Sequence, residues 1–224
     1  MLKVLIPALH YPPVIGGLEV WIENIAERVG DENTQVFLVT GRVEGEPEEE
    51  TRGGAKIIRT SLFPLKDLSY SSFFYIATAL PFIFFRCLAL IRKEKIDLCH
   101  CHGFLGGFLG LLLKAFTNTP YLITIQSADF DIYHPKAGGI TTYIHDSLEK
   151  KIFQEAAKRH TVSTFLQEFY ESRGIEDSIL IPNGVELDKF KPLADRQKAR
   201  KELGFDVQHL FICVSRLEHK NGTH

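Results

Sequence analysis

Short apolar runs alternate with longer segments in which apolar residues recur every three or four positions. The short runs are typical of buried strands, and the periodic segments are typical of amphipathic helices. The strand-like runs are Lys3–Leu9, Thr34–Thr40, Ala55–Arg59, Ile96–His100, Tyr121–Ile125, His160–Val162 and Ile179–Ile181. The helical patterns are Leu18–Val29, Tyr70–Lys93, Phe104–Phe116, Thr141–Lys158 and Thr164–Glu171. This alternation predicts an α/β fold, a doubly wound parallel sheet with helices on both faces.

The first strand and the first helix are joined by a turn that contains Gly16 and Gly17. A strand, a glycine turn and a helix in this order aim backbone N–H groups and the positive end of the helix dipole at one point. Because glycine lacks a Cβ atom, a phosphate can approach the backbone closely there. The turn lacks the G-x-G-x-x-G spacing of dinucleotide sites. It predicts either a phosphate contact or only a tight connection.

Polar residues follow several of the predicted strands at their carboxyl ends. In parallel sheets these ends share one edge, where ligands bind. His102 follows the fourth strand, Gln126 and Asp129 follow the fifth, and Ser163 follows the sixth. We expect a pocket at this edge. Asp129 also suits a turn and His102 also suits a hydrogen-bonded structural histidine, so these two alternatives stay open.

The pattern changes after Ile181, where Pro182-Asn183-Gly184 predicts a turn. A short charged helix, Arg196 to Leu203, and a new apolar run, Leu210 to Val214, follow. We therefore assign residues 1–193 to a first domain, and 194–224 to a linker helix and the first strand of a second domain. Residues 215–224 are too few to complete that domain, so we expect a fragment or a truncated gene product.

The charge and the cysteines exclude several classes of function. A formal net charge of −2 without a basic cluster argues against a nucleic-acid partner. The acidic run Glu44–Glu50 is interpreted as a solvated loop. In Cys99-His100-Cys101-His102 the cysteines and histidines of a strand would face opposite ways, so we expect no metal site. We expect all four cysteines, Cys87 and Cys213 included, to be small buried thiols in a reducing compartment.

No secretory signal is visible, so we expect a cytoplasmic protein. The apolar stretch Phe73–Ile91 contains Pro81 and Arg86 and has a basic end. It favours a buried crossover helix over a membrane span, with a helix resting on the membrane surface as a third option. That option would place the protein peripherally at the inner face of the membrane.

Five segments resemble the amino-terminal half of a family 4 (group 1) retaining glycosyltransferase of the GT-B architecture. They are Pro12–Glu19, Asp97–Gly103, Val162-Ser163, Ile181–Pro192 and Val214–Leu217. The resemblance implies two Rossmann-like domains that face each other across a cleft, with an acceptor-side first domain and a donor-side second domain. It implies a nucleotide sugar as donor, a hydroxyl acceptor (sugar, lipid or glycan) and no metal cofactor.

The resemblance also implies roles for particular residues. Gly16, Gly17, Arg216 and Lys220 would bind the donor phosphates; His102, Gln126 and Asp129 would bind the acceptor. Many members have His-Gly where this chain has Gln126-Ser127, and the common lysine would fall at Asn221, one place after Lys220. The catalytic residues stay unassigned, because the family's glutamate pair would lie beyond His224.

The complete protein is therefore expected to be an enzyme and this fragment to be inactive alone. Two other readings stay open. One is a sugar-nucleotide epimerase of the same architecture, and the other is a non-catalytic sugar- or lipid-binding module. Apolar surface exposed where a partner domain docks would also allow the fragment to form a homo-oligomer.

Overall fold

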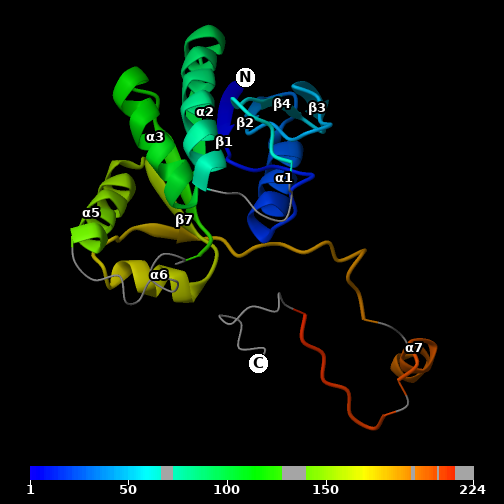
Figure 1. Ribbon diagram of the computed structural model, residues 1–224. Helices are drawn as coiled ribbons and strands as arrows, with labels where there is room; N and C mark the ends of the chain where they lie inside the picture. Colours follow the sequence, from blue (N-terminus) through cyan, green and yellow to red (C-terminus); the bar gives the residue numbers. More distant parts are fainter. Residues whose placement is uncertain (67–72, 128–139, 193–194, 206, 215–224) are drawn as a thin grey trace. The chain divides into compact units, whose positions relative to one another are not determined.

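A computed structural model describes residues 1–66, 73–127, 140–192, 195–205 and 207–214 of the chain (Figure 1). The chain forms two compact units, Met1–Pro182 and Asn183–His224. The sequence places the domain boundary at residue 193, so the chain leaves the first unit earlier than expected. The helix expected at Arg196–Leu203 is present as α7, Arg196–Glu202, and is capped by the Asp195 side chain.

The elements of the first unit follow the predicted alternation closely. Its strands are β1 (Leu2–Pro7), β2 (Thr34–Thr40), β3 (Glu49–Arg52), β4 (Ala55–Arg59), β5 (Leu98–His102), β6 (Tyr121–Ile125), β7 (Lys158–Thr161) and β8 (Ser178–Leu180). Its helices are α1 (Gly17–Val29), α2 (Phe73–Glu94), α3 (Gly103–Thr117), α5 (Ile140–Glu155) and α6 (Thr164–Glu171).

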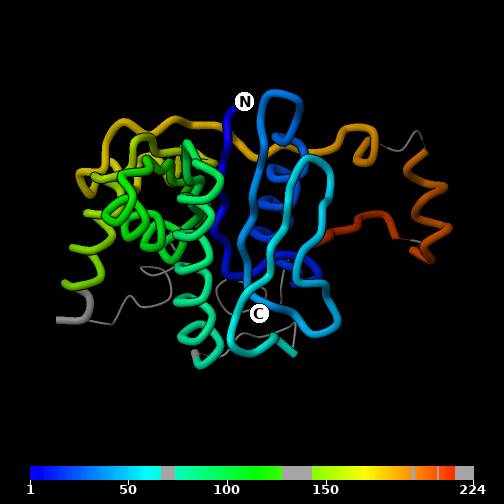
Figure 2. Tube along the Cα trace, turned by 90° about the horizontal axis from the view of Figure 1, so that it is seen from above, coloured from blue at the N-terminus to red at the C-terminus, as the bar shows by residue number. Residues whose placement is uncertain are grey.

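All eight strands belong to one sheet, in the order β3-β4-β2-β1-β5-β6-β7-β8. Every pairing is parallel except β3 with β4, which form an antiparallel edge hairpin, pale blue to cyan in Figure 2. Starting from β1, the chain builds first towards β4 and then returns to add β5 to β8 on the other side. The carboxyl ends of β1 and β5 therefore flank the point where strand order reverses, the usual ligand position in such sheets. The prediction of a doubly wound Rossmann-like fold is confirmed.

The two faces of the sheet carry separate apolar cores. On one face, Ile22 and Ala26 of α1 pack with Val36 and Leu38 of β2. On the other face, α2, α3, α5 and α6 pack over residues that include Cys99 and Cys101 of β5. His100 and His102 point the other way, where both rings contact Trp21 of α1. The predicted separation of cysteines and histidines on β5 is therefore correct.

The acidic run is not a solvated loop throughout. Glu49 and Glu50 begin β3 and pair with Ile58 and Ile57 of β4. The Glu50 carboxylate lies 2.6 Å from a guanidinium nitrogen of Arg59, whose side chain is only 1% exposed. An acidic segment forms an edge strand here because it neutralises a buried cation.

The apolar run Leu210–Val214 does not form the expected strand. Residues 209–214 have no strand assignment, and Phe211 and Val214 are more than nine-tenths exposed. A strand needs a neighbouring strand to pair its backbone, and no such neighbour exists among the described residues of the second unit. Cys213, in the same run, is exposed rather than buried, whereas Cys87, Cys99 and Cys101 are buried as expected.

Candidate functional site

A pocket of about 770 Å³ lies at the carboxyl ends of β1, β5 and β6. Its walls come from the loop after β1, the first turns of α1 and α3, one side of α2, and α5 and α6. The lining residues include Ala8, Leu9, His10, Leu18, Glu19, Ile22, Ile76, Leu80, His102, Phe104, Leu109, Ser127, His145, Glu149, Phe153 and Tyr170. The pocket is where the strand ends predict it, at the switch point of the sheet.

The glycine turn borders this pocket through the start of α1. Gly16 is the N-cap of α1 and has extended backbone angles, and no side chain caps the helix. A Cβ atom on Gly16 would clash with the Glu19 carboxylate, whereas a Cβ atom on Gly17 would meet nothing within 4 Å. Gly17 therefore has open space beside it, at an end of a helix whose first N–H groups are suited to an anion. Neither glycine is among the described lining residues, although Leu18 and Glu19 are.

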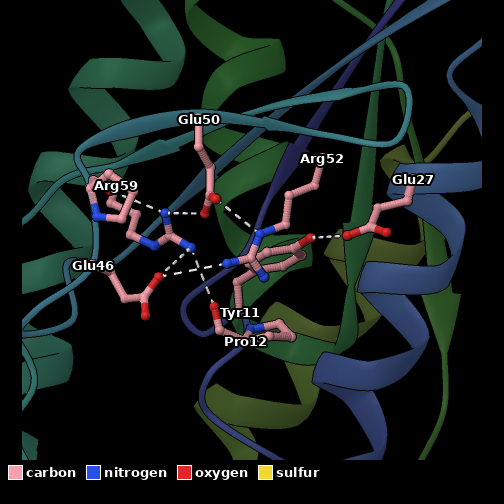
Figure 3. A network of polar contacts seen from close by, with 8 residues as sticks. Tyr11, Pro12, Glu27, Glu46, Glu50, Arg52 and Arg59 are labelled. Carbon is pink, nitrogen blue, oxygen red and sulfur yellow. Dashed lines mark hydrogen bonds and ion pairs between the residues drawn. The ribbon is translucent and has the colours of Figure 1, made fainter.

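A buried network holds the turn in place (Figure 3). Arg59 of β4 donates to the carbonyl oxygen of Pro12 at 3.3 Å and to that of Pro47 at 3.1 Å. Its guanidinium also lies 3.6 Å from the Glu46 carboxylate. Next to it, the Tyr11 hydroxyl donates to Glu27 of α1 at 3.0 Å. The turn is thus tied both to the edge hairpin and to α1.

His102 ends β5 and lines the pocket with only 5% of its surface exposed. Neither ring nitrogen has a hydrogen-bond partner among the described residues. Burial, together with the neighbouring His100 and His160, lowers the pKa of His102 well below its ordinary value. The imidazole is therefore neutral near pH 7, with one nitrogen that donates and one that accepts. Such a group suits a ligand hydroxyl better than a phosphate.

His10 adds a second polar group on the pocket wall. Its Nε2 is buried without a partner among the described residues, and its Nδ1 lies 3.9 Å from Glu19. Burial lowers the pKa of His10, against the opposing effect of the Glu19 charge. His10 was not predicted, although it directly follows the first strand-like run and so carries the same signal that marks His102.

Gln126 directly follows β6, and its side-chain Nε2 is buried without a partner among the described residues. It is not among the described lining residues, but Ile125 and Ser127 on either side of it are. An amide can donate and accept hydrogen bonds but cannot act as a base near neutral pH.

A chain of hydrogen bonds crosses the sheet beside His102. His100 Nε2 lies 2.8 Å from the Thr124 hydroxyl, which lies 3.0 Å from His160 Nδ1. His160 Nε2 donates to the carbonyl oxygen of Ile181 at 2.8 Å. Since a carbonyl only accepts, a neutral His160 carries its proton on Nε2, so Thr124 donates to His160 and accepts from His100. Burial and the nearby His160 lower the pKa of His100 to about 3.

On the helical side of the pocket, α5 contributes His145 and Glu149. The His145 ring stacks on Phe104 with ring centres 4.4 Å apart. Glu149 is buried and accepts a hydrogen bond from the Tyr170 hydroxyl at 3.2 Å. These residues come from helices that no strand-end rule marks, so sequence reasoning missed them. Ser163, in contrast, serves as the N-cap of α6, where its hydroxyl accepts from the N–H group of Leu166.

Three predicted site residues, Asp129, Arg216 and Lys220, lie outside the described residues. The thiols of β5 do not form part of the site. Burial raises the pKa of Cys99 to about 12 and also raises that of Cys101 well above its ordinary value, so both stay protonated. Neither offers the thiolate that a metal ion binds.

Comparison with known proteins decides the family. Residues 15–189 match the family model described as Glycosyltransferase Family 4. The chain belongs to this family. The matched range runs from the glycine turn through every strand of the sheet after β1 to the first residues of the second unit, so the family match covers most of the pocket walls.

Two curated relatives are 26% identical over 99% of this chain. One is an uncharacterized glycosyltransferase of Methanocaldococcus jannaschii, and the other is a D-inositol 3-phosphate glycosyltransferase of Corynebacterium jeikeium. The alignment covers 57% of each relative. The chain therefore spans a little over half the length of these relatives.

Solved structures show the same fold. Sucrose-phosphate synthase from Thermosynechococcus elongatus superposes with a TM-score of 0.71 at 22% identity, over 92% of this chain and 53% of that one. The HepE protein of Anabaena, solved in complex with UDP, gives a TM-score of 0.57 at 14% identity, over 91% of this chain and 50% of that one. The first unit is one Rossmann-like half of the GT-B architecture.

Proposed function

We propose that the complete protein transfers a sugar from a nucleotide-sugar donor to a hydroxyl group of an acceptor, with retention at the anomeric carbon. The family match supports sugar transfer, and the pocket carries the proposal for this chain. His102 has two buried nitrogens without a partner among the described residues, and it lines the pocket at the switch point of the sheet together with Leu18 and Glu19 of α1. A protein maintains such an unsatisfied group at a cost in stability, which ligand binding can offset.

Sugar transfer requires one set of residues for the negatively charged leaving group and another for the neutral acceptor hydroxyl. The departing diphosphate accumulates negative charge, and fixed N–H donors and cations stabilise it. Gly16 and Gly17 at the start of α1 would supply the N–H groups, and Arg216 and Lys220 the cations. The acceptor hydroxyl needs a neutral partner that can accept its proton in a hydrogen bond. His102 would fill that role, and Gln126 and Asp129, which follow the neighbouring strand β6 in the sequence, would bind the acceptor beside it.

The proposal includes no metal cofactor. It places the protein in the cytoplasm, peripherally at the inner face of the membrane, through α2. Donor, acceptor and nucleotide base stay unnamed. UDP in the HepE structure is a nucleoside diphosphate of the kind that a nucleotide-sugar donor would release, and in this respect it supports the proposed donor class.

The test is release of a nucleoside diphosphate from a panel of nucleotide sugars. We expect turnover by a form that carries a complete second domain, and little or none by the 224-residue chain alone. Product analysis by NMR then shows whether the anomeric configuration is retained. Turnover without any acceptor would favour the epimerase reading, and turnover by the short chain would contradict the proposed inactivity of the fragment.

A sugar- or lipid-binding module is the second candidate function. It is favoured by the fact that the described pocket walls all come from the first unit, so a ligand could bind without the second one. Calorimetry with hydroxylated ligands measures this binding directly. Binding without turnover in any longer form would make it the better description.

Substitution of His102 separates a ligand-binding role from a structural one. In the complete protein we expect His102→Leu to lower kcat/KM by roughly 10- to 100-fold, the value of one lost hydrogen bond to a buried ligand group. The same change should leave the free energy of unfolding unchanged or higher, because two unsatisfied nitrogens leave the interior. His102→Gln keeps a donor and an acceptor and should recover part of the activity. A structural histidine would give the reverse, a less stable protein with normal turnover.

Substitution of Gly17 tests the phosphate contact. Since the space beside it is open, Gly17→Ala should fold normally and unfold at the same or a slightly higher temperature. If a diphosphate approaches the backbone here, the added methyl group should weaken nucleoside diphosphate binding by about tenfold, as measured by calorimetry on the complete protein. Unchanged affinity would mean that the glycine pair only allows a tight turn.

A further inference from the structure

The exposed side of α2 is apolar over four turns. Phe74, Phe82 and Phe85 are 64%, 41% and 66% exposed. Ala77, Pro81 and Ala89 are also exposed between and beside them. We call these six residues the aromatic stripe. Single exposed apolar residues are ordinary, but a continuous row along one side of a helix marks an interaction surface.

The opposite side of α2 belongs to the protein core. Ala79, Ile83 and Cys87 are fully buried there. The segment Phe74–Glu94 is long and apolar enough to cross a membrane by length and composition. Crossing would remove these residues from the core, and it would break the 2.7 Å bond of Arg86 to Glu49 of β3. The helix therefore suits a position on a membrane surface, with its core side still packed on the sheet.

The apolar surface extends beyond the stripe at both ends. Phe84 contacts both Phe85 and the 62% exposed Phe116 of α3, with ring centres 5.3 and 5.7 Å apart. At the other end, the half-exposed Phe63 stacks on Phe74 at 5.9 Å. The surface thus spans two helices that pack side by side, as Figure 1 shows. A broad apolar surface of this kind matches a flat partner, such as a membrane, better than it matches a partner with a narrow groove.

The charged residues at the end of the aromatic stripe indicate what kind of flat surface the stripe contacts. Arg92, Lys93 and Lys95 are exposed where α2 ends. Glu94 is only partly exposed and lies 3.8 Å from both Lys3 and Lys93. An apolar row followed by a basic cluster fits a bilayer with anionic headgroups, in which the rings enter the acyl boundary and the cations meet the phosphates.

We infer that the aromatic stripe docks the protein on the surface of an anionic lipid bilayer. Ile76 and Leu80, on the inner side of the same helix, line the pocket. Docking would therefore hold the pocket close to the headgroup layer. The purpose of docking rests on the proposed function, since a transferase at a membrane gains access to hydroxyl acceptors there, but the docking itself does not require transfer.

The test is flotation of the 224-residue chain with vesicles of phosphatidylcholine, alone or mixed with phosphatidylglycerol, without any nucleotide sugar. We expect binding to the anionic vesicles that weakens as salt is added. Phe82→Gln/Phe85→Gln replaces two exposed rings with polar side chains. It should reduce the partition coefficient between water and the anionic vesicles roughly thirtyfold. Phe165→Gln, at an equally exposed phenylalanine of α6, is the matched control and should bind like the unmodified chain.

Circular dichroism of each variant checks that the helices are intact, since glutamine is a good helix former. Equal binding by the double variant and the control would overturn the inference, as would failure of the unmodified chain to bind anionic vesicles. Dimers that dissociate in the double variant, without any vesicle binding, would assign the stripe to a second copy of the chain instead. Vesicle binding that persists when every transfer assay fails would leave docking standing and remove only the proposed function.

Discussion

Replacing Arg59 by methionine is expected to lower the free energy of unfolding by about 3 kcal/mol, the low end of the range for breaking a buried ion pair. The guanidinium is almost fully buried and lies near two carboxylates, Glu50 and Glu46, which remain 20% and 25% exposed. Methionine would fill the space, but Glu50 and Glu46 would keep only Arg52 as a cation. The carbonyl oxygens of Pro12 and Pro47 would lose their donor. Partial solvation of the two acids keeps the expected loss from being larger. Chemical denaturation monitored by circular dichroism measures it.

Lys56→Met is the matched control for this change. Lys56 is on the same strand and lies 3.1 Å from Glu49, but both partners are about half exposed. A solvated pair of this kind contributes only about 0–1 kcal/mol. Equal stability losses in the two variants would contradict the assignment of Arg59 as a buried anchor. In Arg59→Met/Glu50→Gln the carboxylate that has lost its buried partner is gone, so part of the lost stability should return, less the cost of weakening the contact with Arg52.

The pH dependence of the Arg59 variant supplies a second check. Burial alone would raise the pKa of Glu50, but the hydrogen bonds and charges of Arg59 and Arg52 outweigh it and hold the pKa below its ordinary value of 4.5. A carboxylate with a lowered pKa stabilises the native state above its unfolded pKa, and this contribution disappears as the pH falls through the folded value. The variant should therefore lose less stability than the unmodified chain below about pH 4.

The same network shows why β3 could not be predicted. Acidic residues have low strand propensity, and Glu44–Glu50 has no alternation of apolar and polar positions. The strand exists because of its partner in the edge hairpin, where a buried arginine of β4 lies against the acidic side chains. Six of the other strands were predictable because their apolar residues report burial directly, without reference to a partner. β7 has no apolar residue within its bounds, and only Val162 just after it marked its position.

The residues of the site likewise divide into those that the sequence could predict and those that depend on packing between distant elements. Its location follows from strand ends, since the ends of parallel strands meet wherever helices form right-handed crossovers. His102 was accessible to this reasoning, because it directly follows a strand-like run. His145 and Glu149 were not, since they reach the pocket only through the packing of α5 against α3. The roles of Gly16, Gly17 and Gln126 stay predictions, as do those of Asp129, Arg216 and Lys220.

The second large effect is expected on mild acidification. Between about pH 6.5 and pH 5 the unmodified chain should lose about 3 kcal/mol of stability, roughly 1.6 kcal/mol from each of His100 and His102. Both histidines are held neutral in the native state by burial, first of all, and by neighbouring histidines. In the unfolded chain they bind protons from their ordinary pKa of 6.5 downwards. Because the unfolded state then binds more protons than the native state, stability falls as the pH falls.

His102→Leu isolates half of this effect without removing a hydrogen bond, since neither nitrogen of His102 has a partner among the described residues. The variant should lose only about 1.6 kcal/mol over the same pH interval, as measured by denaturant titrations at each pH. His100→Leu is a less clean test, because it also removes the bond to Thr124. Carboxylates have ordinary pKa values near 4.5 and titrate mainly below this interval. If the variant and the unmodified chain lost stability in parallel, His102 would have to bind a proton in the native state as readily as in the unfolded chain, and the conclusion that burial holds it neutral would be wrong.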